Sequence, residues 1–342
     1  MEELKLPLHI SGLWKPVYGE DYLKTGSLGI GLVLEPLTKI YLKSSGDCDL
    51  RINDECIELS HIKIAREIYG FQDRIEVHQE IPLGAGAGLS ANISIAIGYG
   101  VSRRYSQDFL TRIILAGLIG HELEVSQRTG LGDVISELTG YGIEIRKRPG
   151  PPCHGYLENI DIREDLLITT LVMPQKIFTP RMLDTYSSDL MRLFDKLYNY
   201  FINDASIERF FEVSKIFSRE QGFLNKDLEE RINSILSHRF RLGDVMGFYV
   251  KKSLIVIGHK EDLSFEINYL RNIIPIRRIM TLKISRKPLI PVYNNDIRIR
   301  DKCSEATNIY NRKPRPLRRE GGQKKQNSSK PFHHHFTKSL YL

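Results

Sequence analysis

The sequence predicts an α+β protein of two domains followed by a basic tail. Its 342 residues suit two domains at about 100–200 residues each. Short apolar runs typical of strands alternate with segments of helical periodicity, and the composition changes near residues 148–152 and again near Pro291. Hydrophobic residues make up 41% and charged residues 27% of the chain, which is typical of a globular protein and excludes wholesale disorder.

The first half is expected to mix strands with long helices and to end near residue 160. A helix is expected over residues 107–124, where apolar residues recur on one face. Three prolines within residues 149–152 cannot lie inside a helix or a central strand, so the first domain is expected to cover residues 1–160. The expected strands cover residues 28–34, 39–42 and 74–78.

The second half, residues 161–290, is expected to be an α+β domain with the order strand, helices, hairpin, helix, strand. Thr179 and Pro180 have the character of a helix N-cap followed by proline at the first helical position. Apolar residues from Leu190 to Phe201 would form one face of that helix. The other expected elements are strands over residues 166–173, 248–250, 254–257 and 279–284, and helices over residues 207–219, 226–238 and 263–273.

Residues 291–342 are expected to be a disordered basic tail, because so few apolar residues cannot offset the entropy of ordering. From Arg298 onward, 12 Lys and Arg face 3 Asp and Glu, so this stretch carries +9 and the rest −2 of the net +7. The near-neutral body is therefore not expected to bind nucleic acid. The tail could bind RNA, and His333-His334-His335 could loosely hold a metal, but an incidental extension is favoured. Its deletion is expected to leave activity intact.

The cysteines and the N-terminus indicate a cytoplasmic protein without membrane spans. No apolar run approaches the roughly 20 residues that cross a bilayer, and residues 1–7 do not have the character of a secretion signal. None of the cysteines forms a C-x-x-C pair, so all four are expected to be unpaired thiols in a reducing compartment, and a zinc site is not expected. They are Cys48, Cys56, Cys153 and Cys303.

The strongest local signal is a glycine-rich loop between an expected strand and an expected helix. Glycines allow the backbone to approach a phosphate closely, and the N–H groups at a helix N-terminus bind anions. The loop ends without Gly-Lys-Ser/Thr, so it is no Walker A motif, and a simple tight turn remains an alternative. Its sequence is Pro82-Leu83-Gly84-Ala85-Gly86-Ala87-Gly88-Leu89-Ser90-Ala91-Asn92.

Two carboxylates adjoin the next glycine-bearing turn. Glu122 lies near the end of the expected helix, and Asp133 follows eleven residues later, within Gly130-Leu131-Gly132-Asp133. Phosphoryl transfer to an alcohol needs a metal ligand for the phosphates and a carboxylate that orients or deprotonates the hydroxyl. Ser90, Glu122 and Asp133 could supply these groups between them. Solvated surface carboxylates are the alternative.

Together these segments resemble the GHMP kinases, the superfamily of galactokinase, homoserine kinase and mevalonate kinase. The resemblance implies an ATP-dependent kinase with Mg²⁺, in which the loop binds ATP through Pro82, Gly84, Ala85, Gly86, Ala87, Gly88, Leu89, Ser90, Ala91 and Asn92. It also implies that Ser90 and Glu122 bind the metal and that Asp133 acts on the substrate hydroxyl. The implied fold has an N-terminal ribosomal protein S5 domain 2-like domain and a C-terminal ferredoxin-like α+β domain.

The chain departs from the family pattern at three places. Leu89 replaces the first serine of the loop, and His9 stands where the family has an early lysine. The third, glycine-rich motif is only partly retained, with residues 243–248 as its best candidate. A fold that binds ligands without catalysis therefore remains an alternative.

The N-terminal segment Pro7-Leu8-His9-Ile10-Ser11-Gly12 and the turn Gly26-Ser27-Leu28-Gly29 are similar to those of one subgroup, the archaeal pantoate kinases. That resemblance implies phosphorylation of pantoate to 4-phosphopantoate, a step toward coenzyme A. Homoserine, shikimate or a mevalonate-type alcohol remain alternative substrates, and a homodimer is possible by analogy. The residues that could contact pantoate are His9, Ser11, Lys24, Ser27 and Arg128.

Overall fold

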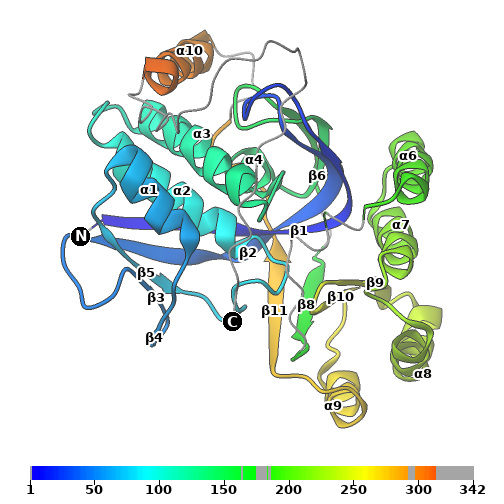
Figure 1. The fold of residues 1–342 in the computed structure, drawn as a ribbon. Helices are drawn as coiled ribbons and strands as arrows, with labels where there is room; N and C mark the ends of the chain where they lie inside the picture. The colour runs from blue at the N-terminus through cyan, green and yellow to red at the C-terminus, as the bar shows by residue number, and fades with distance from the viewer. Residues whose placement is uncertain (1, 163–164, 175–182, 184–185, 292–296, 313–342) are drawn as a thin grey trace, which may run out of the picture.

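A single mixed sheet runs through both halves of the chain, with helices gathered on either side of its bend (Figure 1). The computed structural model describes residues 2–162, 165–174, 183, 186–291 and 297–312. Along its main path the sheet has the strand order β4-β3-β5-β2-β11-β8-β10-β9, and β1, β6 and β7 join it at β2. This mixture of strands and helices confirms the predicted α+β class.

The long strand β2 (Gly26–Lys43) is the centre of the sheet. It pairs antiparallel with β1 (Glu2–Val17) along nearly its whole length. Its first half also pairs with β6 (Ile143–Arg148), and its second half pairs with β5 (Arg74–His78). Between these, Leu34 and Glu35 pair with the end of β11 (Arg278–Ile284). One strand therefore connects elements from both halves of the chain.

The remaining strands extend the sheet in two directions. In the second half, β8 (Leu167–Val172), β9 (Val245–Lys251) and β10 (Leu254–His259) form an antiparallel sheet with β11. In the first half, β3 (Leu50–Ile52) lies parallel to β5, and the hairpin of β6 and β7 (Tyr156–Ile160) holds the proline-rich segment in its loop. The short strand β4 (Glu55–Cys56) closes that edge. The sheet is thus continuous past residue 160, where the sequence predicts the domain boundary.

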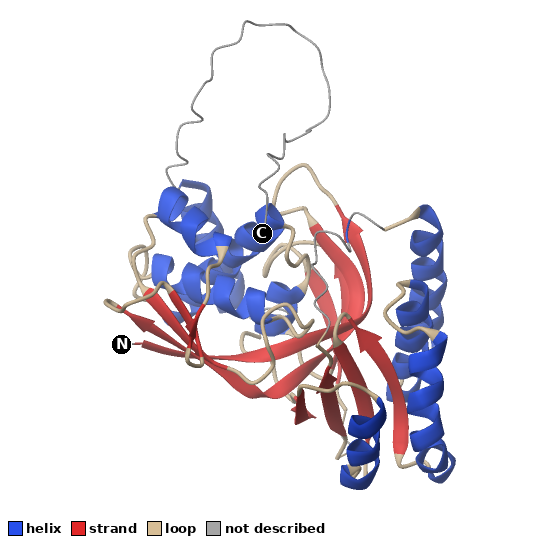
Figure 2. Ribbon diagram, turned by 60° about the horizontal axis from the view of Figure 1, so that its bottom comes forward, coloured by secondary structure: helices blue, strands red, loops and turns tan. Residues whose placement is uncertain are grey.

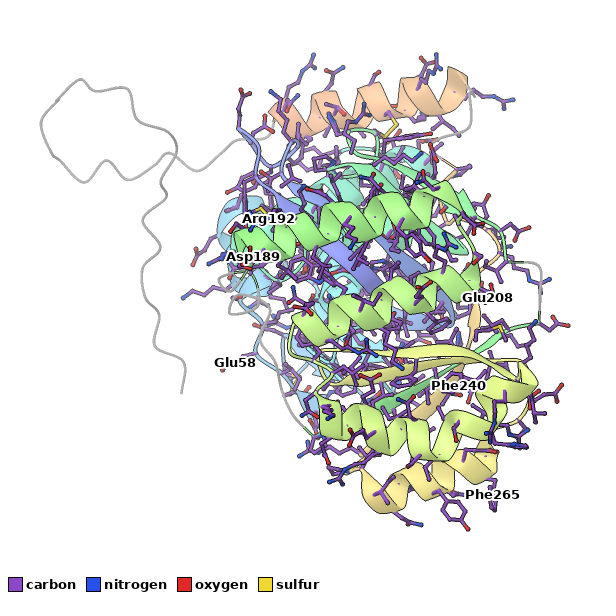
Figure 3. All side chains as sticks on the ribbon, turned by 90° about the vertical axis from the view of Figure 1, so that its right-hand side faces the viewer. Glu58, Asp189, Arg192, Glu208, Phe240 and Phe265 are labelled. Carbon is purple, nitrogen blue, oxygen red and sulfur yellow. A yellow bond between two sulfur atoms is a disulfide. The ribbon has the colours of Figure 1, made fainter. Side chains whose placement is uncertain are left out.

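The helices form two groups that cover different parts of the sheet (Figure 2). The first group packs with β1, β2 and β5 around one core, which includes Ile95, Leu118 and Val77. The second group covers β8 to β10 on the other side, where α6 to α9 lie side by side as an outer layer (Figure 3). The first group is α1 (Ser60–Tyr69), α2 (Leu89–Ser102), α3 (Phe109–Gln127) and α4 (Asp133–Thr139). The second is α6 (Ser188–Asn203), α7 (Ile207–Glu220), α8 (Lys226–Leu242) and α9 (Ser264–Ile273).

Small residues at every fourth position bring α2 and α3 into backbone contact. A Cβ at Gly98 would lie 2.9 Å from the Cα of Ala116, and one at Gly120 would lie 2.9 Å from the carbonyl carbon of Ser94. Neither helix could approach so closely with larger side chains. Because the helices run antiparallel, this contact also brings the last turn of α3 to the first turn of α2.

Most of the expected elements are present with small changes at their ends. Residues 28–34 and 39–42 are parts of the single strand β2, and the expected helix at 107–124 is α3. Helix α6 begins at Ser188, where the Ser187 side chain accepts a hydrogen bond from the backbone of Leu190. The N-cap expected at Thr179 and Pro180 lies outside the described residues. Strand β1, helix α1 and the hairpin of β6 and β7 were not predicted.

Part of the expected disordered tail is a helix. Residues 297–312 form α10 (Ile297–Arg312), which packs against α3. Ile299, Ala306 and Tyr310 are buried there, at spacings of seven and four residues that place them on one helix face. The high charge of this segment concealed an amphipathic helix. Residues 313–342, with the histidines at 333–335, lie outside the described part of the chain.

The expectation of four unpaired thiols is wrong. Cys48 pairs with Cys56 across the β3–β4 hairpin, with Cα atoms 6.0 Å apart. Cys153, in the β6–β7 loop, pairs with Cys303 of α10, with Cα atoms 5.7 Å apart. These partners depend on the tertiary fold, so their spacing along the chain could not have predicted them. The cytoplasmic location stays a prediction.

None of the described helices is long and apolar enough to cross a membrane. Within the same residues, no cluster of three or more His, Cys, Asp or Glu side chains could hold a metal ion.

The packing of α10 on α3 changes the expected result of deleting the tail. A chain that ends at residue 290 should melt roughly 5–15 °C lower than the full chain, because it loses the buried contacts of Ala306 and Tyr310, worth a few kcal/mol. A chain that ends after Arg312 keeps α10 and is the matched control. Thermal unfolding under oxidising conditions measures both. Equal melting temperatures for the two truncated chains would contradict the role of α10.

Candidate active site

A pocket lies where the glycine-rich loop, the first two strands and the β9–β10 turn meet. Strand β1 contributes Ser11 and Trp14, and β2 contributes Ser27. The turn before α4 closes one side, and Lys251 and Lys252 enter from the second half of the chain. Loop and turn residues in the lining are Pro82, Gly84, Gly86, Ala87, Gly88, Leu89, Ser90, Thr129, Gly130, Leu131, Gly132 and Asp133.

The glycine-rich loop has the conformation that its sequence requires. Gly84, Gly86 and Gly88 have φ values of +85°, +116° and +77°, a region that residues with a Cβ rarely adopt. A Cβ at Gly88 would also collide with the carboxylate of Glu137. The glycines are at least partly exposed at the pocket, while Ala85, Ala87 and Leu89 are buried. The loop thus presents backbone to the pocket and anchors itself by its apolar side chains.

The loop leads directly into α2, whose N-terminus faces the pocket. Gly88 is the N-cap residue, and the first helical residues Leu89 and Ser90 line the pocket. Their backbone N–H groups and the helix dipole favour an anion such as a phosphate at this position. Leu89, which replaces the family's first serine, turns its side chain into the core.

Not every expected loop residue faces the pocket. Ala85, Ala91 and Asn92 lie behind the lining, and Asn92 is fully buried. Its amide nitrogen donates to the carbonyl of Pro7 at 3.0 Å and to Glu137 at 2.6 Å. Asn92 therefore fastens the start of α2 to β1.

The structure does not bring Glu122 to Ser90. The carboxylate of Glu122 accepts a hydrogen bond from the hydroxyl of Tyr310 at 2.5 Å, on the side of α3 that faces α10. Glu124 takes the expected place instead, since the hydroxyl of Ser90 donates to its carboxylate at 3.1 Å. Residues two apart on a helix point in nearly opposite directions, so only one of these glutamates can face α2. The eleven-residue spacing to Asp133 had favoured Glu122, whereas Glu124 is the glutamate that contacts Ser90.

Polar side chains on two neighbouring helices hold Glu124 in place. Ser94 of α2 donates to its carboxylate at 2.9 Å, and His61 of α1 lies 3.1 Å from the same oxygen. His61 Nε2 also lies 2.8 Å from the hydroxyl of Thr129, which lines the pocket. Glu124 is fully buried, so its carboxylate has a fixed position beside Ser90. The pair offers two hard oxygen ligands of the kind that Mg²⁺ takes.

Asp133 is held at the pocket by a buried histidine. Its carboxylate lies 2.7 Å from Nδ1 of His9, and Nε2 of His9 lies 2.8 Å from the carboxylate of Glu144. Arg146 donates to Glu144 and, at 3.0 Å, to the hydroxyl of Ser136. Two carboxylates are thereby matched by a histidine and an arginine, which compensates for the cost of burying them.

The network shifts the pKa values of its members. Burial alone would raise the pKa of Asp133, but the hydrogen bond with His9 and the charges of His9, Arg146 and Lys251 outweigh it and lower the pKa to about 2. Burial would lower the pKa of His9, yet its bonds to Asp133 and Glu144 raise it. Asp133 is therefore ionised at neutral pH, with His9 favoured in its charged form. Asp133 keeps a quarter of its side chain exposed to the pocket.

The five expected substrate residues have different positions. Ser11 and Ser27 line the pocket, as expected. His9 is fully buried and both of its ring nitrogens are engaged, so it positions Asp133 and does not face a substrate. Lys24 is exposed and pairs with Glu20, and Arg128 caps the end of α3 outside the pocket lining.

Arg146 is a functional candidate that the sequence analysis missed. It is almost fully buried, and its Nη2 donates to the hydroxyl of Ser11 at 3.4 Å. Its Nε meets no hydrogen-bond acceptor among the described residues. A Cβ at Gly132 would lie 2.6 Å from this Nε and would also meet Ser27 Oγ, so Ser11, Ser27 and Arg146 converge around Gly132. Arg146 comes two residues after Glu144, so the two side chains lie on the same face of β6. This spacing was the sequence signal that could have identified Arg146 as a partner of Glu144.

Residues 243–248, the expected third motif, begin β9 and do not line the pocket. The far end of that strand does so instead, through Lys251 and Lys252 at the β9–β10 turn. The sequence predicts the hairpin but not that its turn would reach the glycine-rich loop.

Known proteins are similar to the part of this chain that forms the pocket. Residues 56–141, which hold the loop, Glu124 and Asp133, match the family described as the GHMP kinases N terminal domain. A protein named pantoate kinase from Thermococcus kodakarensis is 29% identical over 243 residues, which cover 66% of this chain and 77% of that protein. A pantoate kinase from Methanocaldococcus jannaschii is 26% identical over 276 residues, covering 78% and 96%.

Solved structures share the fold. A protein described as a phosphotransferase related to the CoA biosynthesis pathway has a TM-score of 0.64 at 21% identity, covering 84% of this chain and 96% of its own. A mevalonate kinase has a TM-score of 0.53 at 15% identity, covering 84% and 100%. The predicted resemblance is confirmed: residues 56–141 match the N-terminal domain of the GHMP kinases, and the chain is similar to the two pantoate kinases over 66% and 78% of its length.

Proposed function

We propose that this protein is an ATP-dependent kinase that phosphorylates pantoate to 4-phosphopantoate, a step toward coenzyme A. The observation that carries the proposal is the ionised Asp133, held by His9 opposite a glycine-rich loop and helix N-terminus. The similarity to proteins named pantoate kinase over two thirds or more of the chain supports the choice of substrate.

In the proposed reaction, the loop backbone and the N-terminus of α2 bind the phosphates of ATP. Ser90 and Glu124 would hold Mg²⁺, which would neutralise the charge of the phosphates when bound. The substrate hydroxyl donates a hydrogen bond to Asp133 and attacks the γ-phosphorus, and ADP leaves. An aspartate with a pKa of about 2 is a weak base, so it mainly orients the hydroxyl and takes its proton as the new bond forms.

We assign the carboxylate of the substrate to the polar cluster around Gly132. Ser11 and Ser27 offer hydroxyl donors at the pocket, and Arg146 has a buried Nε with no acceptor among the described residues. Guanidinium and hydroxyl donors together suit a carboxylate. The cluster adjoins Asp133, so a short hydroxy acid bound there would reach it with its hydroxyl.

Two alternatives remain distinct from this proposal. Another alcohol would use the same phosphate and metal residues but would not need the cluster around Gly132. A binding protein without catalysis is less favoured, because Asp133 and the Ser90–Glu124 pair are both held in place by buried partners.

Asp133→Asn should lower kcat by on the order of 10²–10⁴-fold, because it removes the anionic acceptor of the hydroxyl proton. ADP formation with pantoate, homoserine, shikimate and mevalonate measures the wild type and the variant side by side. Turnover of another alcohol in place of pantoate would keep the mechanism and contradict the substrate. If the wild type forms no ADP with any of the four alcohols, the alternative of a binding protein without catalysis would be favoured.

Glu124→Gln should lower kcat by on the order of 10²-fold or more and raise the Mg²⁺ concentration needed for half-maximal rate, because it removes a metal ligand. Glu122→Gln is the matched control, two residues away on the same helix, and should keep kcat within about threefold of the wild type. A larger loss of kcat in Glu122→Gln than in Glu124→Gln would instead support Glu122 as the metal ligand.

Ser27→Ala should raise the KM for pantoate by roughly tenfold and leave the KM for ATP nearly unchanged, because a hydrogen bond to a charged group is worth about 1.5–3 kcal/mol. Initial rates with each substrate varied in turn separate the two constants. Equal changes in both KM values would argue against a carboxylate site around Gly132.

A further inference from the structure

The β9–β10 turn of the second half is attached to the glycine-rich loop of the first. The backbone N–H and the hydroxyl of Ser253 both donate to the carbonyl of Ala85, each at 3.4 Å. The stem of Lys251 lies against Gly86, where a Cβ would come within 3.1 Å of Lys251 Cγ. The turn thus has a defined place beside the backbone that faces the phosphates.

This turn provides both cationic side chains of the pocket lining, Lys251 and Lys252. Lys251 is only 9% exposed, and its Nζ lies 4.9 Å from the centroid of the Trp14 ring. No carboxylate oxygen of the described residues lies within 4.0 Å of that Nζ. A buried ammonium group without an anionic partner is costly, so an anion in the pocket would stabilise it.

The backbone of the turn is strained. Lys252 has a φ of +53°, in the left-handed region. Two-residue hairpin turns of this kind usually have Asn or Gly there, because this region of φ disfavours residues with a longer side chain such as lysine. Strain of this kind gathers at sites where function constrains the chain.

We propose that Lys251 binds the phosphoryl group that is transferred, donating hydrogen bonds to the γ-phosphate oxygens of ATP. The inference rests on the proposed kinase function. Three observations on the position of Lys251 support it: it lies against the loop, it lines the same pocket as Asp133, and its charge acts on that carboxylate. An ammonium group there would neutralise the negative charge of the phosphoryl group between the loop and the attacking hydroxyl.

Charges around the lysine agree with this role. Burial, followed by the neighbouring Lys252, lowers the pKa of Lys251 to about 7, with Arg146 acting the same way and Asp133 opposing it. A bound phosphate would add negative charge and favour the ammonium form.

The first test compares Lys251→Met and Lys251→Arg with Lys215→Met, a control lysine that packs on Phe248 outside the pocket lining. We expect Lys251→Met to bind the ATP analogue AMP-PNP about tenfold more weakly while binding ADP within about twofold. Its kcat should fall by on the order of 10²-fold, with Lys251→Arg intermediate. Wild-type AMP-PNP affinity and kcat in folded Lys251→Met would overturn the proposal.

A second measurement needs no variant and remains informative if Lys251→Met does not fold. Wild-type protein is treated with acetic anhydride near pH 7, and acetylation of Lys251 is followed by mass spectrometry. AMP-PNP should protect Lys251, while adenosine, which has no phosphate, should not. Equal acetylation with both compounds would overturn the proposal.

These probes separate the inference from the proposed function, because AMP-PNP needs no acceptor alcohol. Protection of Lys251 without turnover of any alcohol would support the phosphate site and count against the kinase. Turnover of pantoate by Lys251→Met at the wild-type rate would support the kinase and refute the role of Lys251.

Discussion

Strand β2 is the constraint on which the rest of this structure depends. It pairs with β1, β5, β6 and β11, so a single strand fixes the relative positions of the phosphate loop, the Asp133 network and the second half of the chain. The glycine-rich loop follows β5, and Arg146 lies on β6. Ser27 lies near the start of β2 itself. Because β2 is paired with other strands along both of its edges, a shift of its register by one residue would disturb all of these groups together.

Charge is arranged around the pocket so that one carboxylate favours its ionised form and a buried neighbouring carboxylate favours its neutral form. Asp133 is matched by His9 and keeps its charge, with a pKa of about 2. Glu137, one turn further along α4, is fully buried, and its burial and the charge of Asp133 raise its pKa well above the ordinary value. A neutral Glu137 can sit behind Gly88 without repelling a phosphate at the loop. In the proposed reaction, the same helix would present an anion to the substrate hydroxyl and would avoid a second anion beneath the phosphates.

Local features could be predicted from the sequence, and features that depend on side-chain direction or on distant contacts could not. The glycine-rich loop was predictable because its three glycines serve the backbone of one short segment. Glu122 and Glu124 could not be separated by their distance from Asp133, although Ala116, Gly120 and Glu124 recur at the four-residue spacing of one face. Ala116 and Gly120 mark the face of α3 that packs on α2, so this spacing was the better signal of which glutamate faces Ser90. The lysines of the β9–β10 turn lie more than 150 residues from the loop that they meet, and no local pattern carries that information.

The position of these lysines changes the role of the second half of the chain. Among the described residues, a lining made by the glycine-rich loop and Asp133 of the first half alone would lack a cation beside the loop, since His9 and Arg146 lie outside the lining and contact Glu144. The β9–β10 turn supplies that cation and is attached to the loop by Ser253. Because an electrostatic contribution to phosphoryl transfer depends on a fixed position of the charge, the pairing of β11 with β2 becomes part of the active site. The second half is then a contributor to catalysis, placed by the sheet.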